Sequence, residues 1–503
     1  MSNSSISQPS DECPPVARRS EGGPSGECAG PSGTLPLSRR SFLQKSGGGF
    51  GMLALASLLG RDGLLASAAP VGNPLAPHQP HYAAKAKNVI FLFMSGGPSH
   101  VDLFDPKPDL IRLAGQAIPE SFGQFKTRRN VAKNKLMPPL RPFRPRGQCG
   151  MEVSDFLPHI AEHVDDICLL RGCHGDSVTH PESVYLMNTG SILMGRASLG
   201  AWAAYGLGTE NQNLPAFVVL PDPAGWPKGG APAWGNGYLP AAYQGTLLRG
   251  GASPVLDLES PPGISPARQR LTLDFINKLN REALRPDDTH SELAARINAY
   301  ELAFRMQSHA PEVVDITRET AATRRLYGLD KKITAEFGTR CLLARRLVES
   351  GVRFVQLYCG DTNGWDGHSG MEENHSRLCA QSDLPVAGLL KDLKSRGLFD
   401  STLVIWGGEF GRMPMSEGSD GRDHNPHGFC LWIAGAGIKG GQVIGSTDAV
   451  GLRAEQDKTH VHDIHATILH LLGMDHERLT FHHGGRDERL TDVAGKVIER
   501  ALA

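Results

Sequence analysis

The stretch Lys87–Gly97, KNVIFLFMSGG, is a run of apolar residues that ends in a serine and two glycines. Such a run is typical of a strand that is buried on both faces of a parallel sheet. Further runs of the same kind lie at 166–172, 216–221, 352–361, 401–411 and 429–437.

Helical patterns lie between several of these runs. Apolar residues recur at three- and four-residue spacing over 291–307, 333–349 and 384–396. A last helix is predicted within 461–475, opening with Asp463 as its N-cap and closing at Gly473. Strands that alternate with helices predict an α/β fold with a mostly parallel, doubly wound sheet.

The segments that follow the predicted strands are rich in histidine and carboxylates. In doubly wound sheets, ligands bind beyond the carboxyl ends of the strands. We therefore expect one catalytic face, built from the loops 95–108, 173–190, 360–370 and 408–428.

Two of these loops carry metal-ligating side chains close together. In GWDGHS, Asp366 and His368 stand between glycines that let the main chain wrap a cation; the alternative is a solvated turn. In GRDHNPHG, Asp423, His424 and His427 offer three ligands, and the proline there favours an extended turn over a helix. Together the two loops favour a metal site.

Glu409 follows the strongest predicted strand, in GGEFGR. A buried charge is costly unless it is paired or ligated, so Glu409 either binds metal or is neutralised by Arg412. Arg412 in turn either neutralises this carboxylate or binds an anionic substrate group through its planar fork.

Four further candidates lie in the first two loops. His100 and Asp102 follow the SGGPS turn, whose serines are either a nucleophile or ordinary turn residues. His180 and Ser183 lie in HPESVYLMNTG as catalytic candidates, although a hydrogen-bonded core histidine explains His180 equally well.

This set of side chains suits metal-assisted transfer or hydrolysis at a charged ester. One or two divalent ions would polarise the phosphoryl or sulfuryl oxygens and activate an attacking oxygen. Ligation by histidine and carboxylate without cysteine fits Zn²⁺, Mn²⁺, Mg²⁺ or Ca²⁺, and the spacing does not separate these metals.

Residues 38–68 have the features of a twin-arginine export signal. Arg39 and Arg40 precede a short apolar stretch at 50–59, and small residues then predict cleavage near Ala68–Ala69. The apolar stretch is too short for stable insertion into a membrane. We therefore expect a periplasmic or secreted protein.

The rest of the chain divides by composition. Residues 1–37 are rich in Ser, Pro and Gly and should be disordered, 69–86 form a linker, and 87–503 form the folded domain, with a helical insertion around 265–345. Of the 503 residues, 52 are Lys or Arg and 53 are Asp or Glu, so no excess of positive charge favours nucleic acid as a partner. The oligomeric state stays open.

Most of the folded part resembles one family of proteins. The Tat-exported domain-of-unknown-function 1501 family, a sulfatase-like branch of the alkaline phosphatase superfamily, is similar at NVIFLFMSGGPSHVDLFDPKP (88–108), GWDGHS (364–369), TLVIWGGEFGRMP (402–414), GRDHNPHGFCLWIAGAGIKGGQVIGSTD (421–448) and VHDIHATILHLLGMD (461–475). The resemblance implies an alkaline-phosphatase-like, three-layer α/β/α fold.

The resemblance also implies roles for the candidate ligands. Glu409 stands where the superfamily has an aspartate ligand, and Asp366 with His368 is similar to its Asp–His ligand pair. His424 or His427 is similar to a later histidine ligand.

Three departures from the superfamily pattern concern the reaction. Ser95–Gly97 replace the aspartates that normally end the first strand, so His100 or Asp102 would have to substitute. Phe410 replaces an expected His or Asn. His180 stands where a sulfatase has its modified cysteine, so no formylglycine can form there.

A hydrolase of this kind would therefore use another nucleophile, namely Ser183, Thr179 or a metal-bound water. The sequence thus predicts an exported, metal-dependent hydrolase of sulfate or phosphate esters, acting on a small molecule or a polysaccharide. The alternative is a non-catalytic, metal-stabilised protein that binds an anionic or sulfated polysaccharide.

Overall fold

Strand β1 (Asn88–Met94) lies inside the main sheet, with β7 (Phe354–Cys359) on one side and β8 (Thr402–Gly407) on the other. Both neighbours run parallel to it. Its residues 89, 91 and 93 pack into one hydrophobic core, and residues 90, 92 and 94 pack into another. This alternation is why the segment has no polar face.

The sheet has nine strands in the order β12-β4-β11-β8-β1-β7-β5-β6, with β15 also paired to β4. Every pair is parallel except those that β11 makes with β8 and β4, so β11 alone runs in the opposite direction. The remaining bounds are β4 (Ile167–His174), β5 (Phe217–Leu220), β6 (Thr246–Leu247), β11 (Phe429–Ala434), β12 (Gln442–Ile444) and β15 (Thr459–His460).

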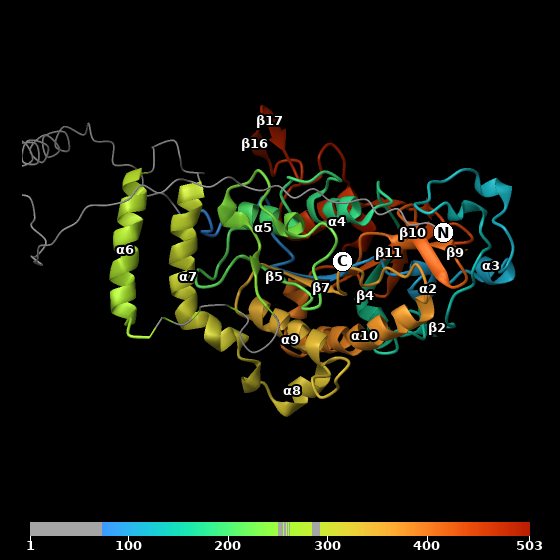
Figure 1. The fold of residues 1–503 in the computed structure, drawn as a ribbon, viewed down its shortest axis with the longest axis horizontal. Coiled ribbons are helices and arrows are strands. Elements are labelled where there is room, and N and C mark those ends of the chain that lie inside the picture. Colours follow the sequence, from blue (N-terminus) through green and yellow to red (C-terminus); the bar gives the residue numbers. More distant parts are fainter. Residues whose placement is uncertain (1–72, 250–254, 256–257, 259, 261, 284–291) are drawn as a thin grey trace, which may run out of the picture. The chain divides into compact units, whose positions relative to one another are not determined.

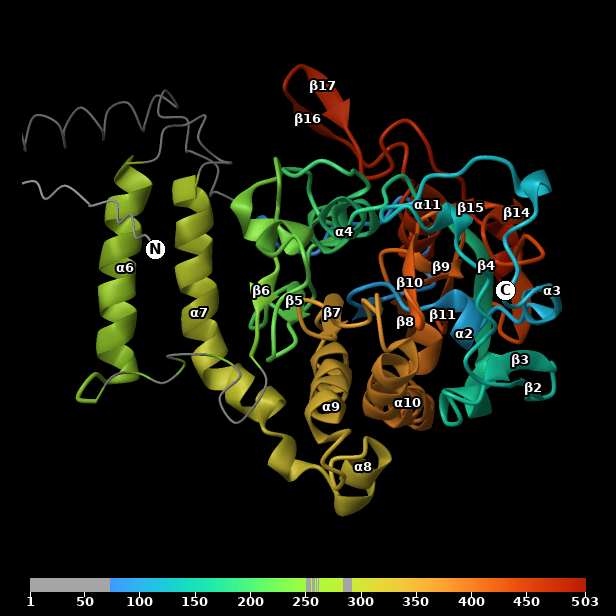
Figure 2. The same cartoon turned by 45° about the vertical axis from the view of Figure 1, so that its right-hand side comes forward.

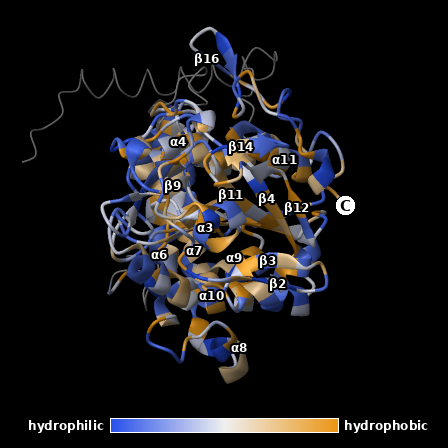
Figure 3. Ribbon diagram, turned by 90° about the vertical axis from the view of Figure 1, so that its right-hand side faces the viewer, coloured by the Kyte–Doolittle hydropathy of each residue, from blue (hydrophilic) through white to orange (hydrophobic). Residues whose placement is uncertain are grey.

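Helices cover both faces of this sheet (Figure 1). One core contains side chains of α4 (His180–Thr189), α5 (Leu199–Leu207) and α11 (Val461–Leu471), and the other contains those of α9 (Ala335–Glu349) and α10 (Met371–Ser395). Figure 3 shows hydrophobic strands, drawn in orange, between α11 on one side and α9 and α10 on the other. The predicted three-layer α/β/α fold with a mostly parallel sheet is confirmed.

The N-cap of helix α11 lies three residues before the predicted one. Its N-cap is His460, whose imidazole accepts a hydrogen bond from the backbone N–H of His462 at 3.2 Å. The prediction of Asp463 as the N-cap is wrong because Asp463 occupies the third helical position, where its carboxylate accepts from the His460 N–H at 2.8 Å. This reciprocal arrangement is a capping box.

A pair of helices, α6 (Pro266–Ala283) and α7 (Glu292–Val314), lies between β6 and β7 in the chain and packs side by side (Figure 2). The smaller elements are α2 (His100–Leu103), α3 (Pro108–Arg112), α8 (Ala321–Leu326), β2 (Phe143–Arg146), β3 (Met151–Ser154), β9 (Gly411–Glu417), β10 (Gly421–Asn425), β13 (Ser446–Thr447), β14 (Ala454–Gln456), β16 (Phe481–His483) and β17 (Arg486–Glu488).

The computed structural model describes residues 73–249, 255, 258, 260, 262–283 and 292–503. The predicted disordered extension (1–37), the twin-arginine signal (38–68) and the start of the predicted linker (69–72) lie outside these residues. Among the helices that are described, none combines the length and the apolar character needed to span a bilayer.

Candidate metal centre

Two glycine-rich loops meet at the carboxyl ends of β1 and β7. The backbone N–H of Trp365 donates to the Ser95 carbonyl at 2.8 Å. Gly96 has a φ of +105°, and a Cβ at this position would lie 2.6 Å from the carbonyl oxygen of Asn363. Only glycine permits this approach of two backbones, which holds Asp366 beside the end of β1.

The GRDHNPHG segment forms part of an antiparallel hairpin rather than an isolated turn. Strands β9 and β10 pair so that Arg412 lies opposite His424, and the register shifts between Arg422 and His424. Neighbouring residues of a regular strand point to opposite faces, whereas a bulge re-aims one of them. The irregularity explains how Asp423 and His424, adjacent in sequence, both supply ligand atoms to one group of residues.

The carboxylate of Asp366 is the centre of the site. Burial alone would raise the pKa of Asp366, but the polar and charged groups around it, among them the Arg412 guanidinium, outweigh burial and hold this pKa far below its ordinary value. The atoms within 3.2 Å of its two oxygens are His180 Nε2 (3.0 Å), His368 Nε2 (3.0 Å), His424 Nε2 (3.2 Å), Arg412 Nη1 (2.9 Å) and Lys228 Nζ (2.8 Å).

The other ring nitrogen, Nδ1, of each of these histidines faces a hydrogen-bond acceptor. Such a contact places the Nδ1 proton and leaves Nε2 as the nitrogen that points at Asp366. The acceptors are Glu409 Oε1 for His180 (2.7 Å), Glu417 Oε2 for His368, and the Val178 carbonyl for His424 (2.7 Å).

These contacts leave two Nε2 atoms, of His180 and His424, whose lone pairs are available to bind a cation. Burial lowers the pKa of His424 to about 2, so its ring is neutral and its Nε2 lone pair faces the Asp366 carboxylate. Among the described residues, the buried Nε2 of His180 has no hydrogen-bond partner, although it lies 3.0 Å from an Asp366 oxygen. Lone pairs that face a carboxylate repel it, and a metal ion bound between them would remove this repulsion.

Two sets of ligand atoms within the described part of the chain could each hold an ion. One set comprises His180, Asp366 and His424, and the other comprises His368, Asp423 and His424. Within each set the ligand atoms lie within 4.8 Å of one another. Because the sets share His424, the structure contains two adjoining candidate metal sites, and the residues present fit a divalent cation.

Glu409 lies behind a ligand rather than in either set. Its Oε1 accepts the Nδ1–H of His180 at 2.7 Å and the backbone N–H of Gly96 at 2.9 Å. Both Glu409 and His180 side chains are 1% exposed. The carboxylate is therefore placed to orient His180 and to fix its tautomer.

His427, a predicted ligand, also lies outside both sets, which were sought among the described residues. Its Nε2 donates to the Lys126 carbonyl at 3.1 Å. Burial lowers the pKa of His427, and the nearby positive charges of Arg453 and Lys126 lower it further, against the opposing effect of the hydrogen bond.

His100 and Asp102 have partners elsewhere. His100 Nε2 donates to the Gly451 carbonyl at 2.8 Å. Asp102 forms an ion pair with Arg422 at 2.8 Å, and both side chains are fully buried. Asp102 also accepts from the Leu140 N–H at 2.9 Å. These two predicted ligands therefore make contacts that support the β9–β10 hairpin.

The predicted catalytic residues differ in their placement. His180 belongs to the first ligand set, whereas the hydroxyl of Ser183 donates to the Ser177 carbonyl at 2.8 Å. Arg412 is fully buried; besides Asp366 it contacts the carbonyl oxygens of Gly96, Gly97 (2.9 Å), Arg422 (3.2 Å) and Trp365 (3.4 Å).

Lys228 and Glu417 are residues of the site that the sequence did not indicate. Lys228 lies between β5 and β6 in the loop GWPKGG and pairs with Asp366, while 28% of its side chain stays exposed. Glu417 ends β9 and holds His368. Each is a single charged residue with no motif around it, so only the spatial arrangement reveals it.

Comparison with known proteins adds several findings. No curated protein matches the chain. Solved structures similar to it include the PsFucS1 sulfatase from Pseudoalteromonas sp. (12% identity, 79% of this chain and 68% of that chain, TM-score 0.32). Also similar are alkaline phosphatase from the Antarctic bacterium TAB5 (12%, 79% and 100%, 0.31) and the lipoteichoic acid synthase LtaP from Listeria monocytogenes (8%, 81% and 78%, 0.32).

Similarities at this level carry no argument about what the chain does. The family comparison is decisive, because one family model covers most of the chain. It matches residues 86–502, which include the whole sheet and both candidate metal sites. The predicted membership is therefore confirmed: the chain belongs to the family described as protein of unknown function (DUF1501).

Proposed function

We propose that the protein is a metal-dependent hydrolase of sulfate or phosphate esters. The observation that supports this most is the convergence of three imidazole Nε2 atoms on one buried carboxylate, each ring held from behind by an acceptor. This is the arrangement of a metal site whose ligands are oriented by outer partners. Its histidine-rich composition favours Zn²⁺ over Mg²⁺ or Ca²⁺.

A bound divalent cation would supply Lewis acidity towards the ester oxygens and a lowered pKa for a water beside it. The chain would hold this cation through His180, Asp366 and His424 in one set, and through His368, Asp423 and His424 in the other. Glu409 and Val178 keep the Nδ1 protons of His180 and His424 in place.

Lys228 is the residue best placed to bind the anionic end of a substrate. Its ammonium group contacts Asp366 at 2.8 Å, yet more than a quarter of the side chain faces solvent. Arg412 has the opposite character, because it is fully buried and contacts backbone carbonyls as well as Asp366. We therefore assign anion binding to Lys228 and the positioning of Asp366 to Arg412.

Metal content tests the first half of the proposal. Elemental analysis of purified protein should find bound metal, and His424→Ala and Asp366→Ala should each lose it, because both residues supply ligand atoms. His427→Ala should keep its metal, since its ring bonds to the Lys126 carbonyl. His482→Ala, at a side chain that is 71% exposed, is the matched control. Full metal content in His424→Ala would overturn the assignment of the ligands.

Turnover tests the second half. The metal-loaded protein is assayed with aryl sulfates, phosphate monoesters and phosphate diesters. Lys228→Gln should raise KM more than it lowers kcat, because a charge that binds the substrate's anionic group acts in the ground state as well as the transition state. Inactivity on every ester of the panel, with metal content intact, would overturn the hydrolase proposal.

One observation favours the non-catalytic alternative. The Ser183 hydroxyl, a predicted nucleophile, donates to the Ser177 carbonyl instead of facing the Asp366 carboxylate. A protein that binds an anionic polysaccharide through a metal-stabilised fold would need no nucleophile. It would show retained metal, retained anion binding and no turnover in the same assays.

A further inference from the structure

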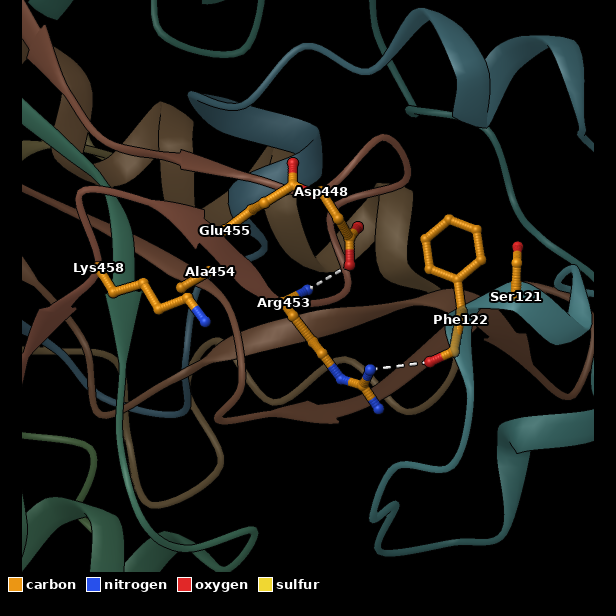
Figure 4. Close-up of a pocket in the computed structure, with 7 residues that line it drawn as sticks. All are labelled: Ser121, Phe122, Asp448, Arg453, Ala454, Glu455 and Lys458. Carbon is orange, nitrogen blue, oxygen red and sulfur yellow. Dashed lines mark hydrogen bonds between the residues drawn. The ribbon is translucent and has the colours of Figure 1, made fainter.

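A groove of about 320 Å³ opens between η1 (Glu120–Phe122) and the segment that contains β14. Figure 4 shows the residues that line it, with the Arg453 guanidinium directed at the Phe122 carbonyl. A second hollow, of about 190 Å³, shares Arg453, Ala454 and Lys458 with it and is also lined by His174 and His427. The two hollows therefore adjoin.

The groove contains two basic residues, Arg453 and Lys458, and two acidic residues, Asp448 and Glu455. Arg453 is fixed by the Phe122 carbonyl at 2.8 Å and the Gln124 carbonyl, and its guanidinium lies 5.7 Å from the centre of the Phe125 ring. Within the described part of the chain, neither Arg453 nor Lys458 forms an ion pair. A fixed guanidinium without a carboxylate partner is ready to bind an anion.

The two acidic residues of the groove form no ion pair with its basic residues. The Asp448 carboxylate accepts the backbone N–H groups of Leu452 at 2.8 Å and Arg453 at 2.9 Å, so it is turned towards its own loop. Glu455, the other acidic residue of the lining, is exposed and forms no ion pair with a described residue.

A basic segment leads from this groove to the metal centre. At one end the Lys126 carbonyl accepts from His427, which lines the smaller hollow. At the other end the Arg129 N–H donates to Asp423 at 2.8 Å, and Asp423 belongs to the second ligand set. The three residue-to-residue steps from 126 to 129 span at most about 11 Å. Among the described residues, Lys126 and Arg128 have no ion-pair partner.

We propose that the unpaired Arg453 and Lys458 of this groove, with Lys126 beside it, bind a second oxyanion group of an anionic oligosaccharide whose scissile ester lies at the metal centre. The inference rests on the proposed function and narrows its substrate to a polyanion rather than a lone monoester. Single-stranded nucleic acid is less suitable, because its binding sites stack bases on aromatic side chains, and Phe122 is the one aromatic residue, apart from histidine, in the lining of the two hollows.

The test compares two double variants of the metal-loaded full chain. Lys126→Gln with Lys458→Gln removes one charge of the groove and one charge of the basic segment beside it. Lys332→Gln with Lys391→Gln removes two exposed charges near or on the α9–α10 layer and is the control. The probes are a fluorescent dextran sulfate oligosaccharide, neutral dextran of equal length and a DNA oligonucleotide of equal charge, each titrated at several salt concentrations.

We expect the groove variant to bind the sulfated oligosaccharide about tenfold more weakly, the size expected when two exposed charge contacts are lost. Its affinity should also depend less on salt, and neutral dextran should not bind. Unchanged affinity in the groove variant, or an equal loss in the control, would overturn the proposal. DNA binding as tight as that of the sulfated chain would overturn the choice of carbohydrate.

Turnover of a small aryl sulfate and a small aryl phosphate by the unsubstituted protein is measured in parallel. If neither ester is hydrolysed while the groove variant still loses affinity for the sulfated chain, the hydrolase proposal fails and the proposal of anion binding by the groove is upheld. If turnover is present and the groove variant binds the chain normally, the groove proposal fails alone.

Discussion

Glu409 provides the sharpest test of how the metal centre is built. The sequence predicts that it binds metal directly, whereas the structure places it 2.7 Å from the Nδ1 of His180, with both side chains 1% exposed. In Glu409→Gln the amide oxygen still accepts from the Gly96 N–H, but the charge behind His180 is lost. A hydrogen bond to a charged group contributes about 1.5–3 kcal/mol, and about 1.4 kcal/mol is tenfold in an equilibrium constant.

We therefore expect Glu409→Gln to weaken metal binding by about 10- to 100-fold, which is also the usual effect of removing an outer partner of a metal ligand. Titration of the metal-free protein against a chromophoric chelator measures the Kd. Glu417→Gln is the matched control, since Glu417 holds His368 in the same way but is 15% exposed, so its loss should matter less. An unchanged Kd in Glu409→Gln, or complete loss of metal as for a direct ligand, would refute this reasoning.

Two further predictions concern stability, both measured by urea unfolding. Asp102→Ala leaves Arg422 buried without its counter-charge and should cost about 3–5 kcal/mol, whereas Asp109→Ala, at an exposed pair, should cost far less; similar costs would contradict this. Burial raises the pKa of Asp383 to about 6, so the folded state favours its protonated carboxyl. That stabilisation is complete below about pH 4 and is lost as the pH rises through 6. Asp383→Asn should remove up to about 3 kcal/mol of this pH dependence, and an unchanged profile would refute the prediction.

The sequence indicated the strands of the sheet because a strand that is buried on both faces is a continuous run of apolar residues. Residues 89–94 are all apolar since alternate side chains enter two different cores. The order of the strands in the sheet produces no such local pattern in the sequence. The reversed direction of β11 depends on the β9–β10 hairpin, which turns the chain back at the carboxyl end of β8. The GRDHNPHG segment therefore lies at the same edge as the ends of the parallel strands.

The sequence by itself indicated the loops that supply the ligand atoms of both sets. Asp366, His368, Asp423 and His424 were all candidates from their glycine-rich surroundings and their position beside buried strands. These are local features, so a single segment is enough to reveal them.

Only the tertiary structure decided which candidates converge and in what role. His180 contacts Asp366, and Glu409 contacts the other side of the His180 ring. Lys228, which also contacts Asp366, belongs to a loop without any motif. His427, three residues after His424, bonds instead to the Lys126 carbonyl. The physical reason is that ligand geometry depends on main-chain contacts between segments far apart in the chain, such as Val178 with His424, and no spacing within one segment encodes these contacts.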